Sequence, residues 1–145
     1  MPGLAKWDTR YLELARHVSG WSRDPSTKVG AIVVRPDKSV ASLGFNGLPR
    51  NVIDSDERLH CRETKLAMTL HAEENAILSA HERLIGCTAY VWPMPPCSHC
   101  AGMLIQAGIA RVVAPVPGER WAQSCRLGRT MMWEAGLEVE WIEES

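Results

Sequence analysis

A histidine, a glutamate and two cysteines occur at spacings that could support metal-dependent hydrolysis. His71 and Glu73 are two residues apart, and Cys97 and Cys100 are three apart, after an intervening strand-like segment. One imidazole and two thiolates are suitable ligands for a tetrahedral Zn²⁺ ion, and three protein ligands leave the fourth position open for water. The sequence therefore predicts a catalytic zinc site with His71, Cys97 and Cys100 as its ligands.

Glu73 carries the carboxyl group that hydrolysis at such a site requires. Zinc lowers the pKa of its water from about 15.7 toward ~7 and so supplies hydroxide near neutral pH. Glu73 would accept the water proton, deliver a proton to the ring nitrogen of a base and later protonate the departing ammonia. The pattern H-x-E…P-C-x-x-C is typical of zinc-dependent base deaminases.

The alternatives for these residues are a structural zinc site and a chance arrangement. A structural site normally has four protein ligands, and His99 is the nearest candidate for the fourth. His99 lies between the two cysteines, on the wrong side of a helical turn, so the sequence favours the catalytic interpretation.

Both halves of the motif are expected at helix N-termini. Cys97 and Cys100 on a first helical turn face the same way, and unpaired amides there favour thiolate over thiol. On a regular helix, His71 and Glu73 would point roughly 200° apart. His71 should therefore lie at the non-helical edge of its helix, with Glu73 turned toward the substrate.

Hydrophobic periodicity predicts the elements that hold these residues. Helices that follow strands imply crossover connections, so we expect one α/β domain over residues 1–145. Its three layers would be helices on both faces of a mixed five-stranded sheet, in which an antiparallel hairpin joins parallel strands. The expected elements are a helix at 7–21, strands at 29–34 and 39–45, a polar segment at 50–65, a helix at 71–81, a strand at 87–92, a helix at 98–107, a strand at 111–114, a helix at 121–135 and an edge strand at 137–141.

The composition of the 145 residues narrows the class of protein. The formal charge of −1 argues against a sequence-independent nucleic-acid binder, although a few local cations suffice for a small phosphorylated substrate. No apolar run approaches the ~20 residues of a membrane span, and residues 1–17 lack the apolar core of a signal peptide. Five cysteines, two of them in a metal-type pair, favour a reducing cytoplasm over a disulfide framework.

Four segments carry a resemblance to the deoxycytidylate (dCMP) deaminases of the cytidine deaminase superfamily. HAEENAI (71–77) and PCSHCAGMLIQAGI (96–109) resemble the superfamily motifs. DPSTKVGAIVV (24–34) and GFNGLP (44–49) resemble segments that nucleoside, guanine and tRNA-adenosine deaminases generally lack. The resemblance runs from about residue 7 to 141. It implies a cytidine-deaminase-like fold, a Zn²⁺ cofactor, conversion of dCMP to dUMP, and a homo-oligomer, often a hexamer in the family.

The resemblance also implies roles for individual residues. His71, Cys97 and Cys100 match the zinc ligands of the family, and Glu73 matches its proton shuttle. The implied substrate contacts extend from the base to the phosphate. They are Asn46 at the sugar, the backbone amide of Ala72 at the pyrimidine carbonyl oxygen, Ser26, Thr27 and Lys28 near the phosphate, and Trp92 and Pro93 as a stacking wall beside the ring.

One segment departs from the regulated members of the family. Those members usually continue the GYNG-type turn with a glycine-cysteine pair that helps to bind an allosteric nucleoside triphosphate. Here the corresponding residues are Pro49-Arg50-Asn51-Val52. We therefore do not expect activation by dCTP or inhibition by dTTP.

Two further groups of side chains are interpreted from spacing alone. Arg58, Arg62 and Lys65 recur at steps of four and three, which predicts one helix face. That face could meet a phosphate, but a solvated or interface-lining face is the favoured interpretation. Most of the tryptophans are expected in core positions and the rest in subunit contacts; those expected in the core include Trp7, Trp21, Trp121 and Trp133.

The sequence therefore predicts a cytoplasmic zinc-dependent hydrolase that acts on dCMP. The first alternative is a deaminase of another small cytosine compound, such as CMP, a modified dCMP or a free nucleoside. The second is a nucleic-acid deaminase that acts on a flipped base, which the charge of −1 disfavours. The third is a non-enzymatic zinc-binding or nucleotide-sensing module, which would not need Glu73. We expect no nucleic-acid or membrane partner.

Overall fold

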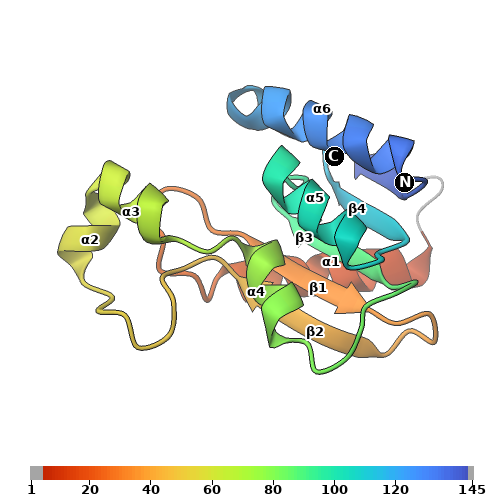
Figure 1. Ribbon diagram of the computed structural model, residues 1–145, viewed down its shortest axis with the longest axis horizontal. Helices are drawn as coiled ribbons and strands as arrows, with labels where there is room; N and C mark the ends of the chain where they lie inside the picture. Colours follow the sequence, from red (N-terminus) through yellow and green to blue (C-terminus); the bar gives the residue numbers. More distant parts are fainter. Residues whose placement is uncertain (1–4, 144–145) are drawn as a thin grey trace.

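A mixed five-stranded sheet forms the middle layer of the computed structural model, which describes residues 5–143 (Figure 1). The strand order is β2-β1-β3-β4-β5; β1 is antiparallel to both β2 and β3, and β3, β4 and β5 are parallel. The strands are β1 (Gly30–Val34), β2 (Val40–Phe45), β3 (Thr88–Trp92), β4 (Arg111–Pro115) and β5 (Glu138–Ile142). This arrangement confirms the expected mixed sheet, its hairpin and its edge strand. Residues 1–4 and 144–145 of the expected single domain lie outside the described residues.

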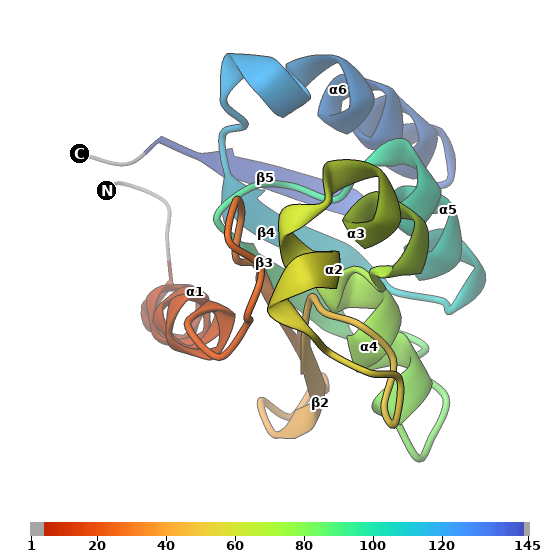
Figure 2. The ribbon, with the colours of Figure 1, turned by 90° about the vertical axis from the view of Figure 1, so that its left-hand side faces the viewer.

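Helices cover both faces of the sheet, as expected for a three-layer α/β/α fold. Figure 2 shows α1 (Lys6–Ser19) on one side of the strands, and α4 (Ala72–Ser79), α5 (Ser98–Gln106) and α6 (Glu119–Glu134) on the other. Two short helices, α2 (Asp56–His60) and α3 (Arg62–Met68), extend from one end of the sheet (Figure 1). None of the described helices is long and apolar enough to cross a membrane.

The central strand β1 shows how the sequence produces two cores. All five of its residues are buried, because helices cover both faces of the sheet at this strand. A strand that is buried on both faces needs a continuous apolar run instead of an alternating pattern. Ala31 and Val33 pack in the core beneath α4, α5 and α6, while Ile32 and Val34 pack against α1. Period-two alternation therefore divides one apolar segment between two layers.

Two glycines allow the helices to lie close against the sheet. A Cβ atom on Gly30 would come within 2.2 Å of the Ala15 carbonyl oxygen, and one on Gly44 within 2.5 Å of the Ala72 carbonyl oxygen. Gly44 therefore lets the first turn of α4 rest on β2. This contact places the residues from His71 to Glu73 relative to the sheet.

A buried ion pair attaches α1 to the parallel part of the sheet. Asp8, in the first turn of α1, accepts hydrogen bonds from Arg111 of β4 at 2.8 and 2.7 Å and from the Tyr90 hydroxyl at 2.5 Å. The hydrogen bond from Arg111 is the main cause that lowers the pKa of Asp8. Arg111 also pairs with Glu138 and Glu140 of β5, at 2.7 and 3.0 Å. One guanidinium thus links three elements.

The structure corrects the expectation for residues 50–65. Instead of a polar segment with one helix face, it contains two short helices separated at Cys61, where the backbone is extended (φ −93°, ψ 102°). Arg58 therefore belongs to α2, whereas Arg62 and Lys65 belong to α3. Lys65 is only 5% exposed, so the favoured interpretation of a solvated charged face is wrong for this residue.

The expectation for the tryptophans is wrong at three positions. Trp7, Trp21 and Trp133 are exposed, and Trp133 is 75% exposed. The three-and-four spacing continues beyond the end of α1, so Trp21 follows the pattern without belonging to the helix. Periodicity identifies a helix face, but it does not show whether a neighbouring element covers that face.

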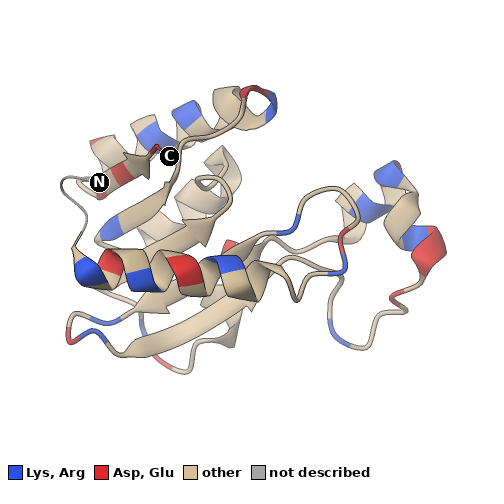
Figure 3. Cartoon of the chain, turned by 180° about the vertical axis from the view of Figure 1, so that it is seen from behind, with Lys and Arg blue, Asp and Glu red and all other residues tan. Residues whose placement is uncertain are grey.

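Charged side chains are interspersed on the face that carries α1. Figure 3 shows Lys and Arg alternating with Asp and Glu along this helix. The alternating residues are Lys6, Asp8, Arg10, Glu13 and Arg16. This arrangement differs from the basic stripe that phosphate backbones attract.

Candidate active site

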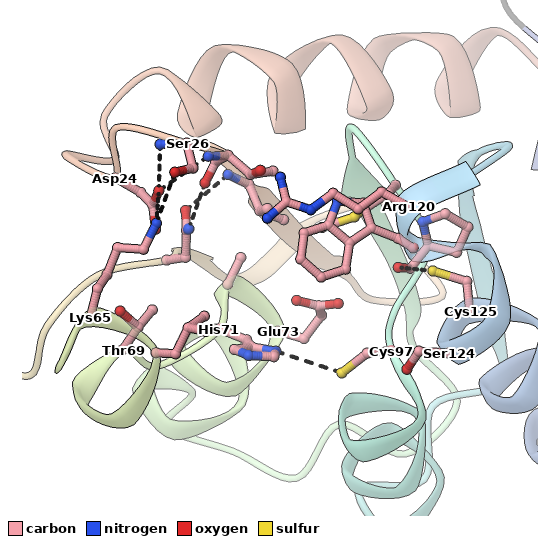
Figure 4. A pocket seen from close by; sticks show the side chains of 18 of the residues that line it. Asp24, Ser26, Lys65, Thr69, His71, Glu73, Cys97, Arg120, Ser124 and Cys125 are labelled. Atoms are coloured by element: carbon pink, nitrogen blue, oxygen red, sulfur yellow. Dashed lines mark hydrogen bonds and ion pairs between the residues drawn. The ribbon is translucent and has the colours of Figure 1, made fainter. Parts of the chain in front are cut away.

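The N-termini of α4 and α5 meet at a pocket of about 150 Å³. The loop between α1 and β1, helix α3 and the first turns of α6 complete its walls (Figure 4). The pocket therefore combines segments that span most of the chain. Its ionisable lining residues are Asp24, Arg62, Lys65, His71, Glu73, Cys97, Arg120 and Cys125.

His71, Cys97 and Cys100 form a compact group, of which His71 and Cys97 line the pocket and Cys100 is buried outside its lining. Nδ1 of His71 lies 3.2 Å from Sγ of Cys100 and 3.6 Å from Sγ of Cys97. All of the ligand atoms in the group lie within 4.8 Å of one another. Ligand atoms at 2.0–2.3 Å from a tetrahedral zinc ion would be about 3.5–3.8 Å apart, so small adjustments of the side chains would let the group hold one ion. Within residues 5–143 this is the one group of three or more such side chains.

Helix caps place these side chains as the spacing predicts. His71 is the N-cap residue of α4 with extended backbone (φ −74°, ψ 159°), which confirms its position at the non-helical edge. Its backbone amide donates to Oε1 of Glu74 at 2.9 Å. Cys97 is the N-cap residue of α5, and Cys100 follows in the first turn. Each half of the group is therefore fixed by the start of one helix.

His99 lies outside the group, as expected. Its side chain is exposed, and its Nε2 lies 3.8 Å from a carboxylate oxygen of Glu74. Among residues 5–143, three protein side chains meet at the group, which would leave the fourth position of a tetrahedral ion to a non-protein ligand.

The three side chains share protons as a coupled set. The hydrogen bond from the Cys100 thiol is the main cause that lowers the pKa of Cys97 to about 3. The same bond raises the pKa of Cys100. A hydrogen bond with Cys97 raises the pKa of His71 to about 9. A thiolate therefore lies beside an imidazolium, and a metal ion would have to displace these protons to bind.

Glu73 is only 5% exposed, and its carboxyl group points into the pocket beside His71 (Figure 4). Burial disfavours the charged form and raises the pKa of Glu73 to about 7. A carboxyl group with this pKa can both accept and release a proton near neutral pH. Its environment is therefore suited to general acid–base chemistry.

Asn46 and Ala72 both line the pocket, as expected of substrate contacts. Oδ1 of Asn46 accepts from the amide of Val29 at 2.9 Å, and its Nδ2 donates to the carbonyl of Thr27 at 2.9 Å. One amide hydrogen of Asn46 is left for a ligand. Ala72 is the first residue of α4, where a backbone amide has no acceptor within the helix.

Among the expected phosphate contacts, Ser26 and Thr27 line the pocket, whereas Lys28 is exposed and lies outside its lining. Trp92 and Pro93 also lie outside the lining, so the structure does not place them as a stacking wall. Trp92 follows Tyr90 by two residues in β3, so its ring points toward α1, where Arg16 lies 5.2 Å from the ring centroid.

A buried ion pair in the pocket wall was not expected from the sequence. Nζ of Lys65 lies 3.0 Å from Oδ1 of Asp24 and donates to the Ser26 hydroxyl at 3.1 Å. Oδ1 of Asp24 also accepts from the amides of Ser26 and Thr27, at 2.8 and 3.1 Å. Burial raises the pKa of Asp24, but these amides and Lys65 outweigh it and leave the pKa below its ordinary value.

The aspartate could have been identified as a turn residue, because Asp-Pro-Ser-Thr is a sequence in which a carboxylate accepts from following amides. Its partner gives no such signal, since Lys65 is 41 residues away. The remaining unexpected lining residues also come from distant segments. They are Arg62, Leu66, Thr69, Met94, Pro95, Arg120, Trp121 and Ser124.

Comparison with known proteins shows which family this chain resembles. The family model of the cytidine and deoxycytidylate deaminase zinc-binding region matches residues 5–116. A protein of Aliivibrio fischeri, described as an uncharacterized deaminase in the luxG 3′ region, is 42% identical over 143 residues, which cover 96% of this chain and 95% of that protein.

Relatives of described activity are more distant. The deoxycytidylate deaminase of Mus musculus is 34% identical over 116 residues, which cover 74% of this chain and 64% of the mouse protein. The chain thus spans less than two thirds of that relative. The crystal structure of a dCMP deaminase from the cyanophage S-TIM5, in complex with dCMP and dUMP, superposes with a TM-score of 0.79 at 26% identity, over 96% of this chain and 98% of that one.

Proposed function

The chain belongs to the cytidine and deoxycytidylate deaminase zinc-binding family, and we propose that it hydrolyses dCMP to dUMP and ammonia. The observation that carries this proposal is that the group of His71, Cys97 and Cys100 opens, through His71 and Cys97, onto the pocket that the buried carboxyl group of Glu73 lines. Similarity to the cyanophage dCMP deaminase and to the mouse deoxycytidylate deaminase supports dCMP as the substrate.

The donor set fits zinc, because one imidazole and two thiolates match the ligands that this ion accepts in catalytic sites. His71, Cys97 and Cys100 would hold it, and the separations of the His71 nitrogen from the two sulfur atoms, 3.2 and 3.6 Å, already lie close to those of a zinc site. Zn²⁺ bound there would lower the pKa of a water molecule toward ~7 and supply a nucleophile for the amine-bearing ring carbon.

Glu73 would move the protons of the reaction. Its carboxylate would accept a proton from the attacking water and deliver it to the ring nitrogen next to the reacting carbon. It would then take the second proton from the hydroxyl group now on that carbon and pass it to the amino group, which leaves as ammonia as the carbon–nitrogen bond breaks and the carbonyl forms. The pKa of about 7 supports this role, since both protonation states are populated near neutral pH.

Neighbouring residues would hold the substrate. The free amide of Ala72 at the start of α4 would donate to the pyrimidine carbonyl oxygen. The remaining amide hydrogen of Asn46 would contact the sugar. Ser26 and Thr27 would lie along the path toward the phosphate, on a loop that Asp24 and Lys65 hold in place.

A substrate panel tests the proposed reaction. Zinc-loaded protein is incubated with dCMP, CMP, dCTP, deoxycytidine and cytosine, and the loss of the cytosine absorbance is followed. We expect the highest kcat/KM with dCMP. Equal values for dCMP and deoxycytidine would remove the claim that the substrate is a nucleotide, and a higher value for CMP would change the sugar assignment.

We also propose a cytoplasmic homo-oligomer built from single-domain chains. The five cysteines are all unpaired, which suits a reducing compartment. Trp133 and Leu127 expose large apolar surfaces on α6, which supports association between subunits. Sedimentation velocity of the purified protein tests the oligomer, and a monomer at micromolar concentration would overturn it.

A further inference from the structure

Two guanidinium groups that line the pocket have no role in the reaction proposed above. Arg62 begins α3, and Arg120 lies in the first turn of α6; both line the pocket. Neither forms a side-chain ion pair with any of residues 5–143. The other lining cation, Lys65, is already paired with Asp24 and Ser26. The pocket therefore presents two uncompensated positive charges, although the chain as a whole carries −1.

Arg120 is held in place by the next residue. Its guanidinium carbon lies 4.9 Å from the centroid of the Trp121 ring, within the range of a cation–π contact. A contact of this kind restrains the long side chain, and the N–H groups of Arg120 form no side-chain ion pair with residues 5–143 that would keep them from a ligand. Such a planar fork matches two oxygens of a phosphate group.

The position of Arg120 suits one end of a nucleotide. Figure 4 shows its side chain along the side of the pocket away from His71 and Cys97, with Glu73 between them. A cytosine nucleotide carries the reacting amine on its base and the phosphate on the far side of the sugar. When the amine meets the metal group, the phosphate must face a more distant wall.

We propose that Arg120, stacked on Trp121 and assisted by Arg62, binds the phosphate of the substrate and sets the preference for a nucleotide over a nucleoside. This inference rests on the proposed function, since it names a residue that recognises the same substrate. Lys28, which was expected near the phosphate, lies outside the pocket lining, so the inference assigns Arg120 as the main cation there.

Arg120→Ala tests the inference, with Arg126→Ala as a matched control on the exposed part of the same helix, outside the pocket lining. Charge-assisted hydrogen bonds lead us to expect that Arg120→Ala lowers the ratio of kcat/KM for dCMP to that for deoxycytidine by about 10- to 100-fold, chiefly through KM. Arg126→Ala should leave the ratio unchanged. Arg120→Lys should recover part of the loss, because it keeps the charge but not the fork.

Calorimetric titration provides a readout that does not depend on turnover. Arg120→Ala should weaken the binding of dUMP by about 10- to 100-fold and that of deoxyuridine far less. Unchanged dUMP binding, or equal loss for both ligands, would overturn the inference alone. Equal kcat/KM of the wild-type protein on dCMP and deoxycytidine would overturn both this inference and the proposed nucleotide substrate.

Discussion

The carboxyl group of Glu73 owes its chemical properties to its burial. Its neighbours Ala72 and Ala76 are fully buried, so little water reaches the start of α4. Loss of water raises the pKa of Glu73 to about 7, whereas an exposed glutamate titrates near 4.3. The residue can therefore exchange protons at the pH at which a zinc-activated water would act.

Glu73→Gln should abolish turnover while retaining the metal. Glutamine keeps the shape of the side chain but cannot carry the proton, so we expect kcat on dCMP to fall by about 10²–10⁴-fold or more. Elemental analysis should still find zinc in this variant. A variant with near-wild-type kcat would contradict the assignment of Glu73.

Cys97→Ala should reduce zinc content and activity together. Cys97 supplies one of three proposed ligands, and a site with two protein ligands holds the ion weakly. Cys61→Ala is the control, because Cys61 is an exposed free cysteine outside the group. Zinc per chain would be measured by atomic absorption after dialysis, and full occupancy in Cys97→Ala would contradict the proposed ligand set.

At the scale of the elements, single polar contacts join segments that are distant in sequence. Asp8 of α1 meets Arg111 of β4, and Asp24 of the loop before β1 meets Lys65 of α3. In both pairs the carboxylate is buried, so removal of its cation leaves that carboxylate poorly compensated. These contacts fix helices that cover the sheet or form the pocket wall.

Asp8→Asn should destabilise the fold in a pH-dependent manner. The pKa of Asp8 is lower in the folded state than in the unfolded chain, mainly because Arg111 donates to it. Its contribution to stability is therefore complete above the unfolded value of about 3.9 and is lost as the pH falls through the folded value.

We expect Asp8→Asn to lower the free energy of unfolding by about 3 kcal/mol at pH 7 and by less at pH 3, which lies below the unfolded value of about 3.9. Urea denaturation at both pH values measures the difference. Glu13→Gln, an exposed change in the same helix, serves as the control and should have little effect at either pH. An equal loss at pH 7 and pH 3 would contradict this role of Asp8.

A double-mutant cycle at Asp24 and Lys65 should reveal strong coupling. Lys65→Met leaves the carboxylate without its cation, and Asp24→Asn leaves the buried ammonium without its anion. Each single change should therefore cost more than half of the double change, with a coupling energy of about 1–3 kcal/mol from urea denaturation. Additive effects would show that the two side chains act independently.

At the scale of the whole molecule, the antiparallel part and the parallel part of the sheet each support one half of the site. Antiparallel β1 and β2 support α4 through Gly44, and parallel β3 and β4 alternate with α5 and α6. The N-termini of α4 and α5 therefore meet at one end of the sheet, and the α2–α3 segment adds a wall there. The pocket and its local positive charge depend on this overall arrangement.

Regulation by nucleoside triphosphates is a property of the whole molecule and can be tested directly. Residues 49–52, between β2 and α2, lack the glycine-cysteine pair expected of regulated relatives. We therefore expect that dCTP and dTTP leave the rate at subsaturating dCMP within about twofold, apart from competition at the active site. A sigmoidal substrate curve that dCTP makes hyperbolic would contradict this prediction.

The sequence by itself determined the residue types of the candidate metal-ligand group and the succession of helices and strands along the chain. Cys97 and Cys100 share one helical turn, and His71 and Glu73 are two residues apart, so their relative directions follow from local backbone geometry. The two-sided burial of β1 likewise appears as a continuous apolar run. Short-range spacing is sufficient to predict the relative directions of side chains that belong to one helical turn or one strand.

Only the tertiary structure decided which other residues reach the pocket. The contact between Asp24 and Lys65, which are 41 positions apart, the presence of Arg120 and Trp121 in the pocket lining, and the direction of Trp92 toward α1 depend on how elements pack. The exposure of Trp133 has the same origin, since periodicity defines a helix face and not its covering. Long-range contacts follow from the close approach of whole elements, which local spacing does not encode.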